Sequence, residues 1–153
     1  MTRAASIAAT AALMLASLPW LAAGASGQPR ARTAANTLRV NDTGHLRLLK
    51  SFGGVLLEEG RASGTLPGSA RVRMVIGSIV TASFTIVARD GSIAGRGRAT
   101  LHSSGRYTSF GGSLSVTGGS GRYAHAYGIG RLYGVIDRRT DALTVQAIGS
   151  LRY

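Results

Sequence analysis

The chain has 153 residues and a net charge of +12 at pH 7, from 18 basic and 6 acidic residues. This length predicts one domain with a sizeable hydrophobic core. There is no cysteine, so a secreted form would be held together by packing and hydrogen bonds, and a lipid-anchored lipoprotein is excluded. The arginines are spread singly, without a basic run interleaved with aromatic residues, which argues against nucleic-acid binding. Their number fits either the codon usage of a GC-rich genome or attraction to an anionic envelope surface.

Residues 1–25 have the pattern of a secretory signal peptide. Arg3 gives a positive start, residues 4–18 are uncharged and rich in Ala and Leu, and small residues lead to a cleavage site after Ala25. The alternative is an uncleaved membrane anchor. Pro19 interrupts the apolar run, and most of the nearby arginines follow it, which disfavours a retained anchor. We therefore expect a secreted, extracellular protein with the signal peptide removed.

Residues 26–43 lack any periodicity, and we expect a flexible N-terminal extension that could add a strand near Leu38–Val40. From Gly44 to Tyr153 apolar and polar residues alternate with period two, which indicates β-strands. Between Ala70 and Ala88 the even positions are mainly apolar and the odd positions mainly polar. The phase continues through Gly77, so this run is either one bent strand or two strands. Arginines fall on the polar face, at positions 71, 73, 89, 96 and 98.

Short loops and turns separate seven or eight such segments in meander order. The expected strands occupy residues 45–50, 55–66, 70–88 as one or two strands, 93–101, 110–117, 128–137 and 143–153. That many strands with one apolar face must close or stack, and closure removes exposed edges. The sequence therefore predicts an all-β fold, a closed antiparallel β-barrel of about eight strands over residues 44–153. The interior of such a barrel holds side chains or one small ligand.

The stretch 116–130, VTGGSGRYAHAYGIG, raises the question of a phosphate-binding loop. A dinucleotide-binding glycine pattern needs a following helix, whereas here another strand follows. We interpret the stretch as a structural corner in which glycines supply unusual backbone angles and a single helical turn plugs one barrel end. Its members are Gly118, Gly119, Gly121, Tyr123 and Gly128.

The segment VTGGSGRYAHAYGIGRL resembles one shared by plant allene oxide cyclases and dirigent proteins. The similarity extends forward to Tyr153 and more loosely back to Gly91. Both plant families form eight-stranded barrels, often trimers, that bind an apolar small molecule inside, so the resemblance implies these properties here. The chain looks most similar to secreted bacterial members of this superfamily. The triplet Ala126-Tyr127-Gly128 lacks the arginine usual in dirigent proteins, and the chain has no cysteine for a cyclase to use. The resemblance therefore supports the barrel and brings no catalytic set with it.

Glu58 is a weak candidate for a catalytic residue. By alternation it shares the apolar face with Leu56 and Ala62. A carboxylate inside a barrel would have a raised pKa and could act as an acid or base. The alternative is a bulge at Gly60, which would reverse the phase and leave Glu58 and Glu59 at a wet rim. The three histidines have no metal-ligand spacing, and we predict neither a metal nor a cofactor.

Candidate ligand-binding residues are Phe84, Phe110, Arg131 and Tyr133. Arg131 and Tyr133 would offer a polar handle if they point inward, and would be surface or subunit contacts if they point outward. Three functions fit these observations. The favoured one is non-catalytic binding of a small apolar or aromatic molecule. The alternatives are a cyclase, isomerase or stereoselective-coupling protein, and an envelope-interaction protein that uses its arginine-rich face.

Overall fold

The structure is a computed structural model, and it describes residues 36–153. The expected signal peptide at residues 1–25 and residues 26–35 of the expected extension lie outside the described residues. Among the described residues, no helix has the length and apolar character needed to cross a bilayer.

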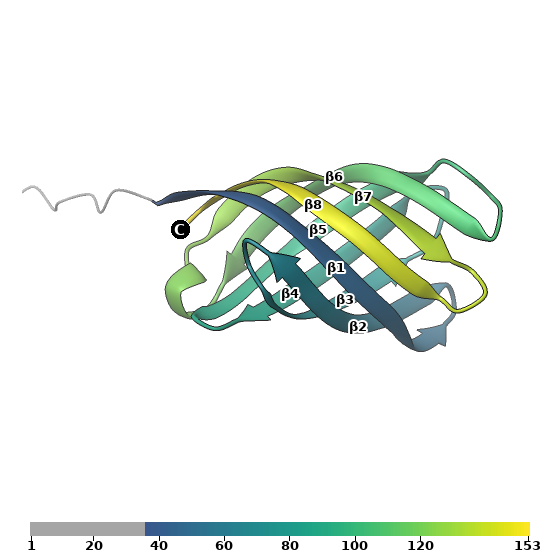
Figure 1. The fold of residues 1–153 in the computed structure, drawn as a ribbon, viewed down its shortest axis with the longest axis horizontal. Helices are drawn as coiled ribbons and strands as arrows, with labels where there is room; N and C mark the ends of the chain where they lie inside the picture. The colour runs from purple at the N-terminus through teal and green to yellow at the C-terminus, as the bar shows by residue number, and fades with distance from the viewer. Residues whose placement is uncertain (1–35) are drawn as a thin grey trace, which may run out of the picture. The chain divides into compact units, whose positions relative to one another are not determined.

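Eight antiparallel strands form a closed barrel in meander order, which confirms the predicted all-β fold and gives the strand number as eight (Figure 1). Each strand pairs with its neighbours in the sequence, and β1 pairs with β8 to close the wall. The strands are β1 (Thr37–Phe52), β2 (Val55–Gly64), β3 (Gly68–Val75), β4 (Val80–Ala88), β5 (Gly91–Leu101), β6 (Tyr107–Gly119), β7 (Tyr127–Asp137) and β8 (Ala142–Arg152). A single 3-10 turn, η1 (Gly121–Tyr123), lies between β6 and β7.

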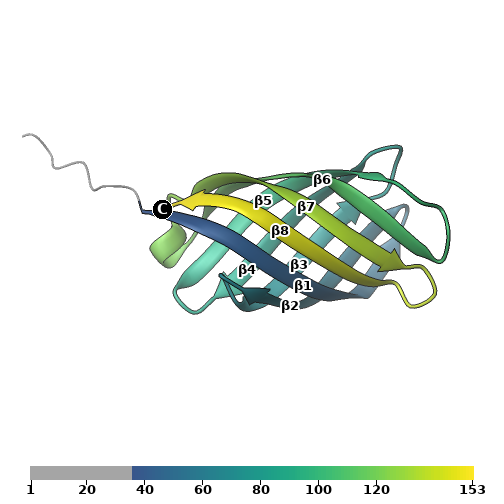
Figure 2. The ribbon, with the colours of Figure 1, turned by 45° about the horizontal axis from the view of Figure 1, so that its top comes forward.

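The barrel begins earlier than Gly44, the boundary expected from the sequence. β1 starts at Thr37, and residues 37–43 pair with β8 from Arg152 back to Gln146. Just outside the two strands, the backbone N–H of Asn36 donates to the carbonyl oxygen of Tyr153 at 3.0 Å, and the reverse bond measures 3.1 Å. The partner for residues 37–43 is thus the last strand, which lies far away in the sequence and which local periodicity does not reveal. Both ends of the barrel segment therefore lie side by side (Figure 2).

Residues 70–88 form two strands and not one bent strand, the two alternatives that the uninterrupted alternation of apolar and polar residues had left open. β3 ends at Val75 and β4 begins at Val80, and the two pair from Gly68–Ala88 to Val75–Thr81. Because the connection preserves the parity, even-numbered residues face the interior on both strands. Outward positions carry the arginines and hydroxyl residues, as the alternation predicts.

The interior holds two apolar clusters. The larger one contains Leu46, Ala62, Ala70, Met74, Val80, Ala99, Phe110 and Leu143. The smaller one lies at the barrel end that carries η1 and contains Leu66, Ile93, Tyr123, Ala126 and Leu151. Two phenylalanine rings lie against glycines of the adjacent strand. A Cβ at Gly95 would lie 2.7 Å from Cε1 of Phe84, and a Cβ at Gly134 would lie 2.7 Å from Cε1 of Phe110. The glycines thus leave room for the two rings beside the adjacent strand.

Candidate functional site

A cavity of about 130 Å³ lies inside the barrel, within the larger apolar cluster. Phe84 and Phe110, two of the predicted ligand-binding residues, both line it. The rest of the lining is aliphatic apart from a few positions, and it includes Leu46, Ala62, Val72, Met74, Leu114, Leu132 and Val145. Inward-facing positions of the alternating strands therefore leave an apolar space at the centre of the barrel.

A second cavity of about 60 Å³ lies nearer the η1 end. It shares five lining residues with the first: Asp42, Phe84, Ile86, Leu114 and Ala147. These shared residues mark the boundary between the two cavities. One of the five, Asp42, carries an ionisable side chain.

Asp42 is a functional candidate that the sequence did not single out, because it was assigned to the flexible extension. It lies on the inner face of β1, and the residue is only 4% exposed. Its Oδ1 accepts a hydrogen bond of 2.9 Å from the backbone N–H of Leu66. Its Oδ2 is buried and has no hydrogen-bond partner. Burial raises the pKa of this carboxyl, while the backbone hydrogen bond from Leu66 acts in the opposite direction.

Glu58 also points inward, and only 2% of it is exposed. The phase of β2 is unbroken from Val55 to Gly64, so the alternative of a bulge at Gly60 is wrong. The irregularity lies across the pair, on β1 between Leu48 and Lys50. Neither oxygen of Glu58 has a hydrogen-bond partner, and burial, with a smaller contribution from the charge of Asp141, raises its pKa to about 7.

The carboxyl of Glu58 does not share a cavity with that of Asp42. Glu58 pairs with Leu48 on β1 and Val72 on β3, and it lines neither interior cavity. The charge of Asp141, in the β7–β8 turn, affects the pKa of Glu58, so Glu58 lies toward the barrel end opposite η1. The two buried acids are therefore separate features, and the geometry does not bring them together as an acid–base pair.

Arg131 and Tyr133 face outward, which decides between the two alternatives left open for them: they are surface residues and do not line the interior. On β7 the odd-numbered residues from Tyr127 to Val135 are exposed, and Tyr133 is 46% exposed. The inner face of this strand consists largely of Gly128, Gly130 and Gly134, so its apolar character is weaker than that of the outer face. Arg131 instead lines a groove on the outside of the barrel.

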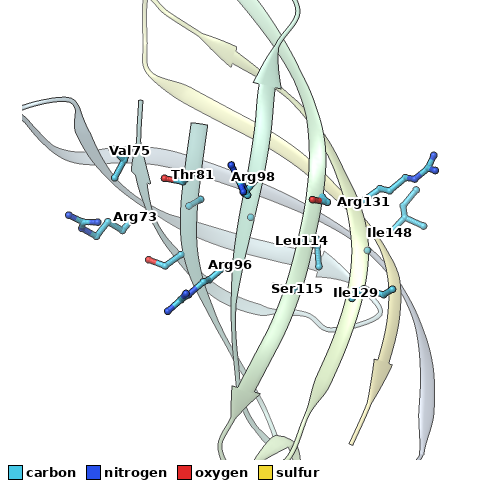
Figure 3. A pocket seen from close by; sticks show the side chains of 15 residues that line it. Arg73, Val75, Thr81, Arg96, Arg98, Leu114, Ser115, Ile129, Arg131 and Ile148 are labelled. Carbon is cyan, nitrogen blue, oxygen red and sulfur yellow. The ribbon is translucent and has the colours of Figure 1, made fainter. Parts of the chain in front are cut away.

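This outer groove has a volume of about 1150 Å³ and crosses β3 to β8. Four arginines line it: Arg73, Arg96, Arg98 and Arg131 (Figure 3). No carboxylate lines the groove, and none of the four is in an ion pair with any residue in the part of the chain that the structure describes.

The strand register arranges these side chains in rows. In one row Arg73, Ser83, Arg96 and Ser115 are successive cross-strand partners on β3 to β6. In the next, Thr81, Arg98, Ser113 and Arg131 follow one another on β4 to β7. Because neighbouring strands are about 4.8 Å apart, arginines two strands apart are separated by about 10 Å, with a short hydroxyl side chain between them.

The stretch 116–130 forms the corner at one barrel end. Gly118 has a φ of 154° and Gly121 a φ of 58°, angles that residues with a Cβ rarely adopt. They lead into η1, where Tyr123 is 6% exposed and its ring meets that of Tyr153 edge to face, with centroids 5.2 Å apart. Two more glycines of the corner lie close to other strands: a Cβ would overlap the carbonyl oxygen of Ser92 at Gly119 and that of Ser150 at Gly128.

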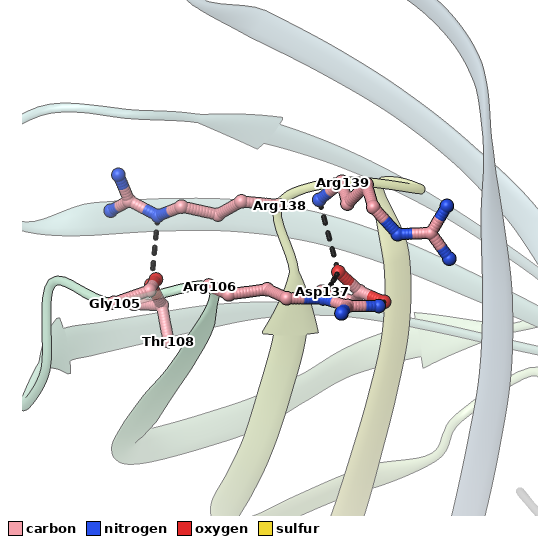
Figure 4. A network of polar contacts seen from close by, with 6 residues as sticks. All are labelled: Gly105, Arg106, Thr108, Asp137, Arg138 and Arg139. Carbon is pink, nitrogen blue, oxygen red and sulfur yellow. Dashed lines mark hydrogen bonds and ion pairs between the residues drawn. The ribbon is translucent and has the colours of Figure 1, made fainter.

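A network of polar contacts lies at the barrel end opposite η1 (Figure 4). Arg106 Nε lies 3.3 Å from Asp137 Oδ1, and Arg138 Nε donates to the hydroxyl of Thr108 at 2.8 Å. Thr108 in turn donates to the carbonyl oxygen of Gly105 at 3.0 Å. The hydrogen bond from Arg106 is the main cause that lowers the pKa of Asp137. These contacts connect the β5–β6 loop to the β7–β8 turn, so they stabilise this end of the barrel.

Within residues 36–153, no group of three His, Asp or Glu side chains is placed to hold a metal ion. No family model, curated protein or solved structure matches the chain.

Proposed function

We propose that the protein binds a small apolar or aromatic molecule inside its barrel, without catalysis. The observation that carries the proposal is the apolar cavity of about 130 Å³ inside a closed wall. Protein interiors are normally packed without such voids. An apolar cavity of about 150 Å³ in another protein stays dry and binds benzene, so a single-ring molecule suits this volume. A non-catalytic role is favoured because Asp42 is the only inward acid on the cavity wall.

Filling the cavity should weaken the binding of a small apolar molecule. Ala62 is buried on the inner face of β2, and its partners on both neighbouring strands are glycines, Gly44 and Gly68. A leucine introduced by Ala62→Leu would therefore project into the cavity. We expect it to raise stability by about 1 kcal/mol and to weaken toluene binding at least tenfold. Binding can be measured by methyl chemical-shift changes and by the toluene-dependent rise in Tm.

The matched control is Ser63→Leu, the next residue on the same strand, which points outward and is exposed. It should leave toluene binding unchanged. Equal toluene affinity in wild type and Ala62→Leu, or no binding by the wild type, would contradict the proposed function.

A second function is favoured by the outer groove: attachment to an anionic polymer of the cell envelope. Its four arginines are free of ion pairs among the described residues and stand in rows with hydroxyl side chains between them. Evenly spaced guanidinium groups suit a chain of phosphate groups, because each can hold two oxygens at once. This role is compatible with an interior ligand, since the groove and the cavity lie on opposite sides of the wall. Export by a signal peptide, the homotrimer and the superfamily resemblance remain predictions.

The double variant Arg96→Ser, Arg98→Ser should weaken binding of inorganic polyphosphate by about tenfold and reduce its dependence on salt. The matched double variant Arg39→Ser, Arg89→Ser removes the same charge from exposed positions outside the groove. Titration of polyphosphate at several ionic strengths compares the two. If both double variants lost the same affinity for polyphosphate, only the net charge would matter, and the groove would not be a specific binding site.

A further inference from the structure

We propose that the molecule bound in the barrel carries one hydrogen-bond-donating group, a hydroxyl or an ammonium, which binds Oδ2 of Asp42. This inference rests on the proposed function, the binding of a small apolar or aromatic molecule, and names the chemistry of its ligand.

The first support is the incomplete bonding of Asp42. Its Oδ1 is satisfied by the N–H of Leu66 at 2.9 Å, but Oδ2 has no partner although the residue is 4% exposed. Buried polar atoms are nearly always hydrogen-bonded, and leaving one without a partner is unfavourable. The bond from Leu66 also fixes the orientation of the carboxyl. A rigid acceptor is thus held in place with one oxygen free.

The second support is the place of this carboxyl in the wall. Asp42 lines both interior cavities, at the boundary where Phe84 and Leu114 also contribute. A molecule in either cavity therefore lies next to it. Glu58, the other buried acid, has two free oxygens but lines neither cavity. Asp42 differs from it in lining both cavities.

The third support is the absence of a competing donor on the described part of the cavity wall. The lining consists of aliphatic, aromatic and glycine residues except for Asp42 and Arg98. Arg98 lies at an exposed position of β5, and its side chain belongs to the outer groove. No protein group there bonds to Oδ2 of Asp42. The complementary ligand is a single apolar ring with one donor, a pattern typical of small-molecule sites in which few polar groups fix the orientation.

Two pairs of probes of matched size test the inference: toluene against phenol, and ethylbenzene against benzylamine. The first pair tests a hydroxyl and the second an ammonium. In at least one pair we expect the donor-bearing probe to bind wild-type protein about tenfold more tightly, the size expected for a hydrogen bond to a buried carboxylate. Its binding should also shift the amide resonance of Leu66, which bonds to the same carboxyl, more than the hydrocarbon does.

Asp42→Ala should remove the preference of the donor-bearing probe over its hydrocarbon partner. Glu58→Gln alters the other buried carboxyl and should retain the preference. The inference is overturned if the wild type binds both hydrocarbons as tightly as their partners, or if Asp42→Ala keeps the preference; the proposed function then stands. If no probe of either pair binds, both fail. Should Asp42→Ala not fold, the wild-type affinities and the Leu66 resonance decide the matter.

Discussion

Tyr123→Ala is expected to destabilise the barrel by about 3 kcal/mol or more, since removal of a buried aromatic ring has a cost of that order. The ring of Tyr123 closes the η1 end, where it packs in the smaller apolar cluster and meets the ring of Tyr153 at 5.2 Å. Its loss would leave a hole beside Leu151 and open this end to water. Urea unfolding gives the stability change, and amide exchange should show the largest loss of protection at the β6–β7 corner.

Tyr133→Ala is the matched control. This tyrosine is 46% exposed on the outer face of β7, and its removal should change the free energy of unfolding by about 0.5 kcal/mol or less. If the two substitutions had similar effects, Tyr123 would not be the plug of the barrel end.

The second large effect is a loss of stability as pH rises, caused by Glu58. Its pKa is raised from 4.5 to about 7, so the folded protein holds this proton more tightly than the unfolded chain. The stabilising contribution is complete below pH 4.5, declines as pH rises toward 7, and is absent above 7. A shift of this size corresponds to about 3 kcal/mol.

Glu58→Gln removes the ionisation and should therefore stabilise the protein by about 3 kcal/mol at pH 8 while changing little at pH 4.5. Glu59→Gln is the control on the same strand: its carboxylate points outward and lies 3.8 Å from Arg71. Urea unfolding between pH 4 and 9 compares the three proteins. A wild type whose stability does not decline across this range relative to Glu58→Gln would refute the assignment.

The period-two pattern was enough to predict the barrel, because most inward positions carry recognisable apolar side chains. Leu46, Met74, Val80 and Leu143, for example, are buried as their parity indicates. On β7 the alternation pattern does not show which side chains point inward. Its inner face is mostly glycine and its outer face carries Ile129 and Tyr133, so composition alone did not fix the direction of Arg131.

The candidate site was harder to predict than the fold. Residues 38, 40, 42, 44 and 46 share one parity, and extending the alternation back from Leu46 would have placed Asp42 inside. An aspartate at an inward position breaks the apolar pattern, however, and the partner of this segment is β8, at the other end of the barrel sequence. The outer groove depends on the register of six strands, which no single segment specifies.

The pairing of β1 with β8 has a consequence for how the chain acquires its structure. The seam joins residues 37–46 to residues 143–152, so it can form only after nearly the whole described segment is available. Contacts between distant segments slow folding. Until then a growing chain presents two bare strand edges and an uncovered lining, which favour association with other chains. Closure of the barrel is thus expected to be a late step of folding, and truncation within β8 should yield insoluble product.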